Sequence, residues 1–139
     1  MRDVRKDDGF SELYKQKIAA AALEVMAEAY NVPLSRLTMA SRQKAHIAFA
    51  RQMAMYLAHV VGQLSLRDVA GAFEREPSTV SYACHAIEDR RDSPIFDKQM
   101  AFLETTLRER VEGAARVEAA FADDGAPTLR SGRQGLAAV

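Results

Sequence analysis

The stretch Leu64–Arg91 constrains the fold most, because it contains two short amphipathic patterns separated by a polar turn. In the first pattern, apolar residues recur at i, i+3, i+4 and i+7 from Leu66 to Phe73, which is the spacing of one helix face. Ser65 precedes this run and has Asp68 three residues later, a capping-box pattern that satisfies free amide donors at a helix N-terminus. We therefore predict a helix over about Ser65–Phe73.

The second pattern predicts a helix over Pro77–Arg90. Pro77 suits the first helical position, where its missing N–H costs nothing. Apolar residues again follow helical spacing from Val80 to Ile87. A helix–turn–helix that binds DNA places such a second helix in the major groove, but an ordinary helical hairpin in a bundle has the same pattern, so both interpretations stay open. The outer face would carry Ser78, Thr79, Ser81, Tyr82 and His85.

Outside this stretch the chain also indicates helices. Hydrophobic residues make up 48% of it, β-branched residues are sparse and no alternating strand pattern occurs. We predict an all-α fold, a compact domain of five to six helices. The further helices are expected over Ser11–Tyr30, Pro33–Leu37 (a short turn), about Arg42–Val61, and Pro94–Glu112.

Several residues are expected to shape this core. In the first helix the inner stripe is expected to contain Ile18, Val25 and Ala29, among others, and both Leu34 and Leu37 are expected to point inward. Gly62 fits the C-terminal cap of the long helix. We predict a lead-in over residues 1–10, one helical domain over 11–112 with the helix–turn–helix at about 65–90, and a largely disordered tail over 113–139.

Several short motifs in this region resemble the C-terminal DNA-binding domain of DnaA, the bacterial chromosomal replication initiator. They occur in the family's order between roughly Ala27 and Arg108. The resemblance implies an all-helical domain that binds short double-stranded DNA sites, with a helix–turn–helix in the major groove and an arginine from a preceding basic loop in the minor groove. The motifs are Arg51–Leu57 (RQMAMYL), Ser65-Leu66, Ala72-Phe73, Ser78-Thr79-Val80 and Ala83–Ile87 (ACHAI).

The resemblance also implies which residues contact DNA. Arg42 and Lys44 stand where the family has its basic loop, and Arg51 stands where a phosphate contact is implied. Without the resemblance, Arg51 is as well explained as a solvated charge on the surface of a helix as by a contact with phosphate. The full expected set is Arg42, Lys44, Arg51, Arg75, Glu76, Ser78, Thr79, Ser81, Tyr82 and His85.

The chain departs from the family pattern in its turn and its loop. The family's turn usually carries Gly-Gly-Arg-Asp-His, whereas Glu74–Pro77 is one residue shorter and has Pro in place of His. Only two cations stand in the basic loop. We therefore expect a DNA preference that differs from the initiator's site at one or two base pairs.

No pattern in the sequence indicates an enzyme. The phosphate-binding motif G-x-x-x-x-G-K-[ST] does not occur, so we expect no bound nucleotide and no ATPase activity. The three histidines lack metal-ligand spacing, and the single cysteine, Cys84, lies on an apolar stripe, so no cofactor or metal is expected. The charged N-terminus argues against a signal peptide, and no apolar run reaches membrane-spanning length. We expect a cytoplasmic, nucleoid-associated protein.

These observations predict a sequence-specific protein that binds double-stranded DNA, a transcriptional or replication regulator without ATPase activity. A protein partner in the replication or transcription machinery is expected. The alternative is a protein-interaction module that kept the fold and lost DNA binding. The balance of 19 basic and 19 acidic residues favours the alternative, whereas the excess of basic residues between Arg36 and Arg91 favours DNA.

Overall fold

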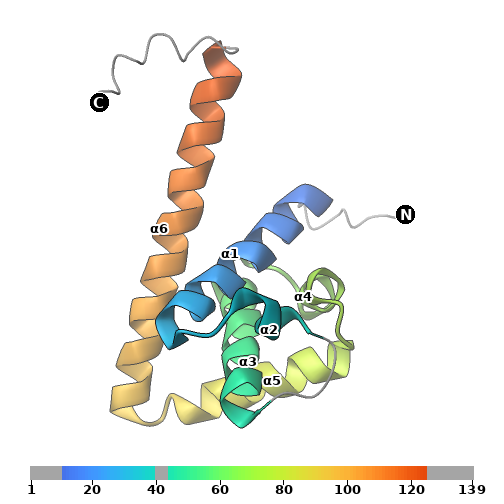
Figure 1. The fold of residues 1–139 in the computed structure, drawn as a ribbon, viewed down its shortest axis with the longest axis vertical. Helices are drawn as coiled ribbons and strands as arrows, with labels where there is room; N and C mark the ends of the chain where they lie inside the picture. The colour runs from blue at the N-terminus through green and yellow to red at the C-terminus, as the bar shows by residue number, and fades with distance from the viewer. Residues whose placement is uncertain (1–10, 40–43, 125–139) are drawn as a thin grey trace. The chain divides into compact units, whose positions relative to one another are not determined.

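The computed structural model describes residues 11–39 and 44–124, which form six α-helices and no strand (Figure 1). The all-α prediction is confirmed. The predicted lead-in, residues 1–10, and the predicted tail beyond Asp124 lie outside the described residues. The helices are α1 Glu12–Tyr30, α2 Leu34–Thr38, α3 Ala45–Val60, α4 Leu66–Phe73, α5 Pro77–Arg90 and α6 Pro94–Asp124.

The chain divides into two units, Met1–Arg108 and Glu109–Val139. Within the first unit, α3 contacts α1, α2, α4 and α5. Its apolar residues from Met53 to Ala58 are all buried, so they form the centre of the core. The recognition helix expected from the sequence, α5, packs directly on α3 through a stripe that includes Val80 and Ile87.

Local signals fix both ends of α1. The Ser11 hydroxyl accepts a hydrogen bond from the Tyr14 amide at 3.0 Å, which caps the first turn. Asn31 ends the helix in the left-handed conformation with φ of 53°. The inner stripe differs in part from prediction: Ile18 and Val25 are buried as expected, but Ala29 is exposed and Met26 is buried in its place.

The short helix α2 contributes one core side chain rather than two. Leu37 is buried, as expected, but Leu34 is 44% exposed, so the prediction for Leu34 is wrong. α2 has five residues, and of these only Leu37, at its fourth position, is buried.

Gly62 matters for close packing rather than for capping. The C-cap of α3 is Val61, and the left-handed conformation falls on Gln63 with φ of 60°, so the predicted capping role is wrong. A Cβ on Gly62 would lie 2.6 Å from both the Ala58 carbonyl oxygen and the Ile18 side chain. Only glycine therefore allows α1 to pass so close to the end of α3.

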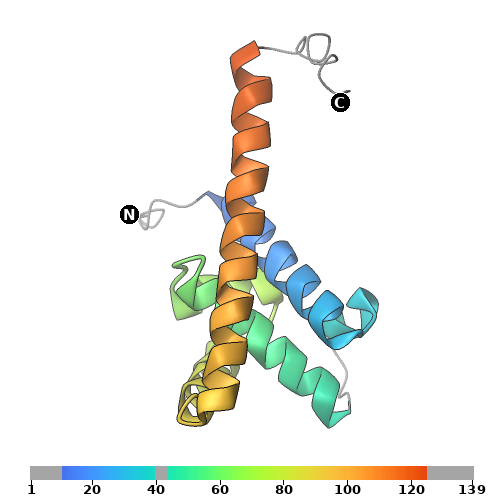
Figure 2. The ribbon, with the colours of Figure 1, turned by 90° about the vertical axis from the view of Figure 1, so that its left-hand side faces the viewer.

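The last helix is longer than predicted. It is one continuous helix through Gly113 to Asp124 (Figure 2), whereas the sequence pattern predicted an end at Glu112. A single glycine inside a helix costs only about 1 kcal/mol relative to alanine, and the flanking alanines, glutamates and arginines favour helix strongly enough to offset it. Within the first unit, α6 buries Met100, Leu103 and Leu107.

Candidate nucleic-acid interface

The two helices of the predicted helix–turn–helix are α4 and α5. The Ser65 hydroxyl accepts a hydrogen bond from the Asp68 amide at 3.0 Å, as the capping pattern predicts. The chain leaves α4 through Glu74, which has the left-handed conformation with φ of 57°, and the Arg75 amide donates to the Ala70 carbonyl at 2.9 Å. Pro77 then begins α5 at the position that proline favours. Both helix boundaries agree with the sequence prediction.

The outer face of α5 is polar and unpaired at its N-terminal end. Ser78 and Thr79 are exposed, Ser81 is half-buried, and the ring of Tyr82 is 69% exposed. Ser78, Thr79 and Tyr82 make no side-chain hydrogen bond within the described part of the chain. This end of the helix therefore presents hydroxyl donors and acceptors, the Thr79 methyl group and an aromatic ring to a ligand.

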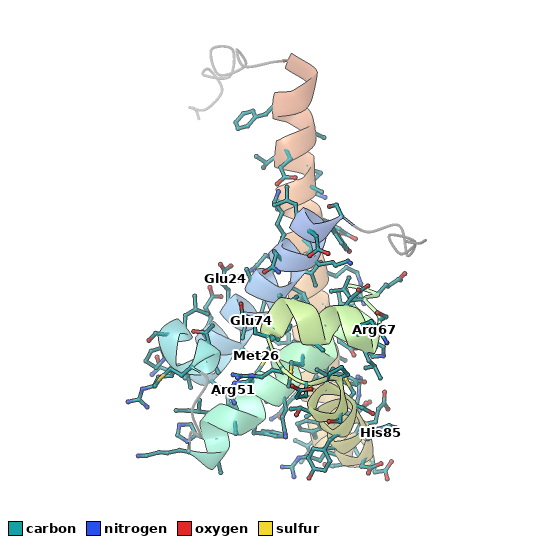
Figure 3. The ribbon with its side chains drawn as sticks, turned by 90° about the vertical axis from the view of Figure 1, so that its right-hand side faces the viewer. Glu24, Met26, Arg51, Arg67, Glu74 and His85 are labelled. Carbon is teal, nitrogen blue, oxygen red and sulfur yellow. The ribbon has the colours of Figure 1, made fainter. Side chains whose placement is uncertain are left out.

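His85 extends this face by one turn. Its Nδ1 lies 2.9 Å from the Ser81 carbonyl oxygen. Because a carbonyl oxygen only accepts, Nδ1 carries the hydrogen, and Nε2 of the neutral ring is an acceptor. Figure 3 shows Arg67 on α4 and His85 on α5 at the same edge of the molecule in that view, whereas Arg51 lies nearer the middle.

The charged residues predicted to contact DNA differ in their surroundings. Arg42 lies outside the described residues. Lys44 is exposed at the N-terminus of α3, and its side chain makes no capping hydrogen bond. Glu76, also exposed, immediately precedes α5 and does not cap it with its side chain.

Arg51 and Arg75 both donate to backbone carbonyls at the end of α2. Arg51 Nε lies 2.9 Å from the Leu37 oxygen, and Arg75 Nη2 lies 2.8 Å from the Met39 oxygen. Burial, with the positive charge of Arg75 adding to it, lowers the pKa of Arg51. The two arginines share a cavity of about 250 Å³. Its other lining residues are Gln16, Ala19, Ala20, Leu23, Leu37, Thr38, Ala72, Phe73 and Glu74.

Sequence reasoning missed one exposed cation in this region, Arg67. It lies in the first turn of α4, where a positive charge opposes the helix dipole and therefore gains nothing locally. In a helix–turn–helix the first helix crosses the DNA backbone, so a cation there is well placed for a phosphate. The unfavourable position of a cation in that turn was the signal that could have identified it.

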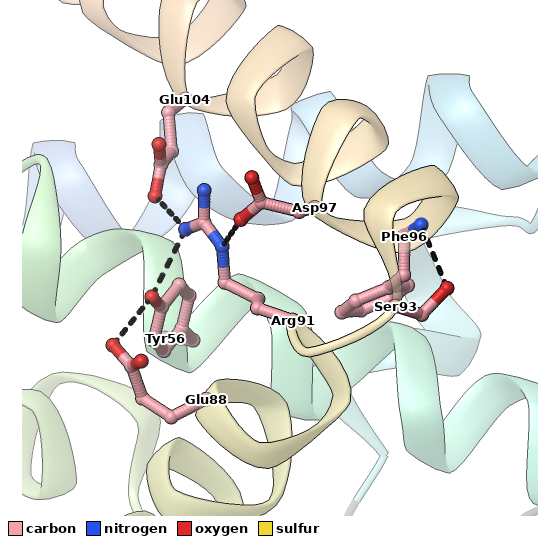
Figure 4. A network of polar contacts seen from close by, with 7 residues as sticks. All are labelled: Tyr56, Glu88, Arg91, Ser93, Phe96, Asp97 and Glu104. Atoms are coloured by element: carbon pink, nitrogen blue, oxygen red, sulfur yellow. Dashed lines mark hydrogen bonds and ion pairs between the residues drawn. The ribbon is translucent and has the colours of Figure 1, made fainter.

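The C-terminal end of α5 is anchored by a polar network around Arg91 (Figure 4). Arg91 Nε lies 2.6 Å from Asp97 and Nη1 lies 2.6 Å from Glu104, both on α6. Nη1 also donates to the Tyr56 hydroxyl at 3.0 Å, and that hydroxyl donates to Glu88 at 2.8 Å. The network joins α3, α5 and α6 in one place.

Burial and charge set the pKa values of this network. Burial raises the pKa of Tyr56 to about 12, with the hydrogen bond to Glu88 acting in the same direction. Burial would lower the pKa of Arg91, but its hydrogen bonds to Glu104, Asp97 and Tyr56 raise it above the ordinary value. Arg91 is therefore charged at neutral pH.

The described residues contain no group of histidine, cysteine and carboxylate side chains that could hold a metal ion. Cys84 is buried, and burial, with Glu88 nearby, raises the pKa of its thiol to about 11, so the thiolate is scarce at neutral pH. Among the described helices, none combines the length and the apolar character that a membrane span needs.

Comparison with known proteins agrees with this geometry. Residues 20–87 match the model of the family described as bacterial dnaA protein helix-turn-helix. The chromosomal replication initiator protein DnaA 2 of Chlamydia trachomatis is 38% identical over 88 residues, which cover 60% of this chain and 19% of that protein. The chromosomal replication initiator protein DnaA of Symbiobacterium thermophilum is 36% identical over 84 residues, which cover 59% of this chain and 18% of that protein. The chain thus spans about a fifth of the length of these relatives.

Two solved structures have the same fold. A crystal structure of a DNA replication initiation factor superposes with a TM-score of 0.64 and 28% identity, covering 71% of this chain and 30% of that one. A replication initiator DnaA bound to AMPPCP and single-stranded DNA superposes with a TM-score of 0.62 and 26% identity, covering 70% of this chain and 30% of that one. Sequence, helix boundaries and superposition agree, and residues 20–87 of this chain belong to the family of bacterial DnaA helix–turn–helix domains.

Proposed function

We propose that this protein binds double-stranded DNA sequence-specifically, with α5 in the major groove, and acts as a transcriptional or replication regulator. The observation that carries the proposal is the outer face of α5, where exposed hydroxyls and the Tyr82 ring have no partner in the described part of the chain. Membership of the DnaA helix–turn–helix family supports the same conclusion. We propose residues 11–112 as the binding domain.

Base reading is assigned to the N-terminal half of α5. The proposed contacts are Ser78, Thr79, Ser81, Tyr82 and His85. Glu76 is proposed to accept a hydrogen bond from a cytosine amino group. Pro77 offers neither donor nor acceptor from its side chain, which is why the preferred sequence should differ from the initiator's site. Each altered base pair should change the binding free energy by ~1–3 kcal/mol.

Lys44, Arg42 and Arg67 are the proposed phosphate and minor-groove contacts, and Arg75, in the turn before α5, is proposed as a fourth. Each cation that neutralises a phosphate contributes about −0.9 to the slope of log K against log salt concentration. Binding should therefore weaken with salt, with a total slope of roughly −3 to −4 for these residues.

Selection from a random pool of duplex oligonucleotides tests the proposal directly. We expect one enriched motif, bound with the salt dependence given above. Thr79→Ala should change the base preferred at one position, whereas Thr105→Ala, an exposed threonine on α6, should leave the motif unchanged. An enriched motif identical for Thr79→Ala and the parent protein would show that the reading residues are misplaced.

We also propose that the protein neither binds nor hydrolyses ATP, because no phosphate-binding loop occurs in its sequence. Addition of nucleotide should leave its DNA affinity unchanged. Saturable ATP binding in a calorimetric titration would contradict this. A cytoplasmic, nucleoid-associated location and a partner in the replication or transcription machinery follow from the DNA-binding proposal.

One observation favours a second candidate, a protein-interaction module. Glu74 and Glu76 are both exposed in the turn before α5, where they repel the DNA backbone. An association with DNA that does not change between low and high salt, or no association with any duplex, would favour this candidate over the first.

A further inference from the structure

Arg51 has little freedom to act as a phosphate contact. Its Nε donates to the Leu37 carbonyl oxygen at 2.9 Å, and its Nη2 is buried with no hydrogen-bond partner among the described residues. The pKa of Arg51 is lowered by burial and by Arg75. A charge that the surroundings disfavour at this position points to a role that uses the N–H group rather than the charge.

Arg75 approaches the same backbone segment from the turn between α4 and α5. Its Nη2 donates to the Met39 carbonyl oxygen at 2.8 Å, across a separation of 36 residues in the sequence. Leu37 and Met39 are at the C-terminal end of α2, where carbonyl groups lack helical partners. Two arginines from different elements thus satisfy carbonyls within one three-residue segment.

The helix that ends in this segment is short. α2 is five residues long, has no side-chain cap, and buries only Leu37. The chain then leads toward Lys44, one of the proposed phosphate contacts. The arginine contacts therefore set where the end of α2 lies relative to α3 and to the turn of the helix–turn–helix.

We propose that Arg51 is a positioning residue for DNA binding, which holds the segment Leu37–Met39 against α3 through its Nε, and that Arg75 holds the same segment to the turn before α5. This inference rests on the proposed DNA-binding function. It assigns to Arg51 a hydrogen bond to backbone rather than a contact with phosphate.

Two substitutions at Arg51 separate the two roles. In Arg51→Gln the amide nitrogen occupies the position of Nε, so the donor to Leu37 is kept and the charge is lost. Arg51→Met has a similar shape but no donor. We expect Arg51→Gln to keep its DNA affinity within about 2-fold and its salt slope unchanged, and Arg51→Met to lose about 5-fold in affinity, the effect of one hydrogen bond. Arg108→Gln, on the exposed surface of α6, controls for the change in net charge.

A phosphate contact would give a different pattern. Both Arg51 variants would then lose affinity equally, and both salt slopes would become shallower by about 0.9. That result would overturn the proposal.

A measurement without DNA keeps this inference distinct from the proposed function. The carbonyl ¹³C chemical shift of Leu37 should move in Arg51→Met and stay in place in Arg51→Gln, because it reports the hydrogen bond itself. If the parent protein binds no duplex, the proposed function fails while this shift still tests the contact. An equal shift change in both variants would overturn the positioning role.

Discussion

The two ends of α5 differ in how they are held. At the N-terminal end, Ser78 and Thr79 are exposed and no side chain caps the helix. At the C-terminal end, Arg91 contacts two carboxylates and a tyrosine hydroxyl, and Arg90 lies 4.6 Å from the ring centre of Phe49. The helix is anchored at one end, and the other end offers its polar groups to a ligand.

The difference shows how a recognition helix is kept available. A side chain that forms hydrogen bonds within the protein is less able to form them with DNA. The N-terminal end of α5, which carries the proposed base contacts and is called the reading end below, therefore cannot be held by its own outer residues. It is held by the inner stripe, where Val80 and Ile87 pack on α3, and by the Arg91 network at the far end. The following experiments test this division of roles.

The largest effect is expected from Val80→Asp, which places a charge on the inner stripe of the reading end. Val80 is fully buried, and a carboxyl group there costs several kcal/mol even when it takes up a proton, which is a large part of the ~5–15 kcal/mol of stability of a typical domain. We expect an unfolded protein by circular dichroism. Thr79→Asp, one residue away on the outer face, should fold normally and lose DNA affinity through repulsion. Equal unfolding of both variants would mean that the outer face of α5 at Thr79 is needed for folding and is not available to DNA.

Next in size is the effect of removing Arg91, the centre of the polar network that anchors the C-terminal end of α5. Arg91→Met leaves Glu104 and the Tyr56 hydroxyl without their shared partner, and we expect a loss of about 2–3 kcal/mol in the free energy of unfolding, measured with urea. Arg90→Met, which removes only the ring contacts of an exposed guanidinium, should cost about 0.5–1 kcal/mol. If the two variants lost equal stability, the network would not be the anchor.

The anchor should also weaken at high pH. The pKa of Tyr56 is raised from 10.0 to about 12, so the folded protein holds this proton more tightly than the unfolded chain does. This difference in pKa contributes about 2–3 kcal/mol to the free energy of unfolding. The contribution is complete below pH 10 and is lost as the pH rises to 12. Urea denaturation at several pH values should show this loss in the parent protein. The difference between the parent and Tyr56→Phe should shrink across the same window, because the phenylalanine cannot ionise.

The smallest effect concerns the turn before the reading end. Glu74 has a left-handed backbone with φ of 57°, which costs a residue with a Cβ more than it costs glycine. Glu74→Gly should therefore raise the free energy of unfolding by about 0.5–1 kcal/mol. Asn31→Gly is the matched control, because asparagine tolerates the same conformation at φ of 53°, and its effect should be near zero. A stability loss in Glu74→Gly would indicate that the carboxylate itself stabilises the turn.

Helix positions could be predicted from the sequence because their signals are local. Ser65, Pro77 and the apolar spacing of α4 and α5 all lie within a few residues of the boundaries that they set. The same holds for the all-α class. The predicted end of α6 at Glu112 is wrong because the single glycine, Gly113, does not outweigh the helix-forming residues on both sides of it.

The candidate site could be predicted only in part. The outer face of α5 follows from the same local spacing, and its contacts with DNA stay predictions. The surroundings of Arg51 could not be predicted, because they depend on carbonyl groups at Leu37 and on Arg75, which meet it only in the folded chain. That a residue is an arginine does not indicate whether its side chain lies against the backbone or faces solvent.

The packing of α5 on α3 limits how small a DNA-binding fragment of this protein can be. A peptide of residues 64–91 would contain every proposed reading side chain of α5, yet its helices have 8 and 14 residues, lengths that are marginal for isolated helices in water. Without α3, the stripe from Val80 to Ile87 would be exposed and the hydroxyls of Ser78 and Thr79 would sample many orientations. Transfer of this specificity to another protein therefore requires transfer of the central helix as well.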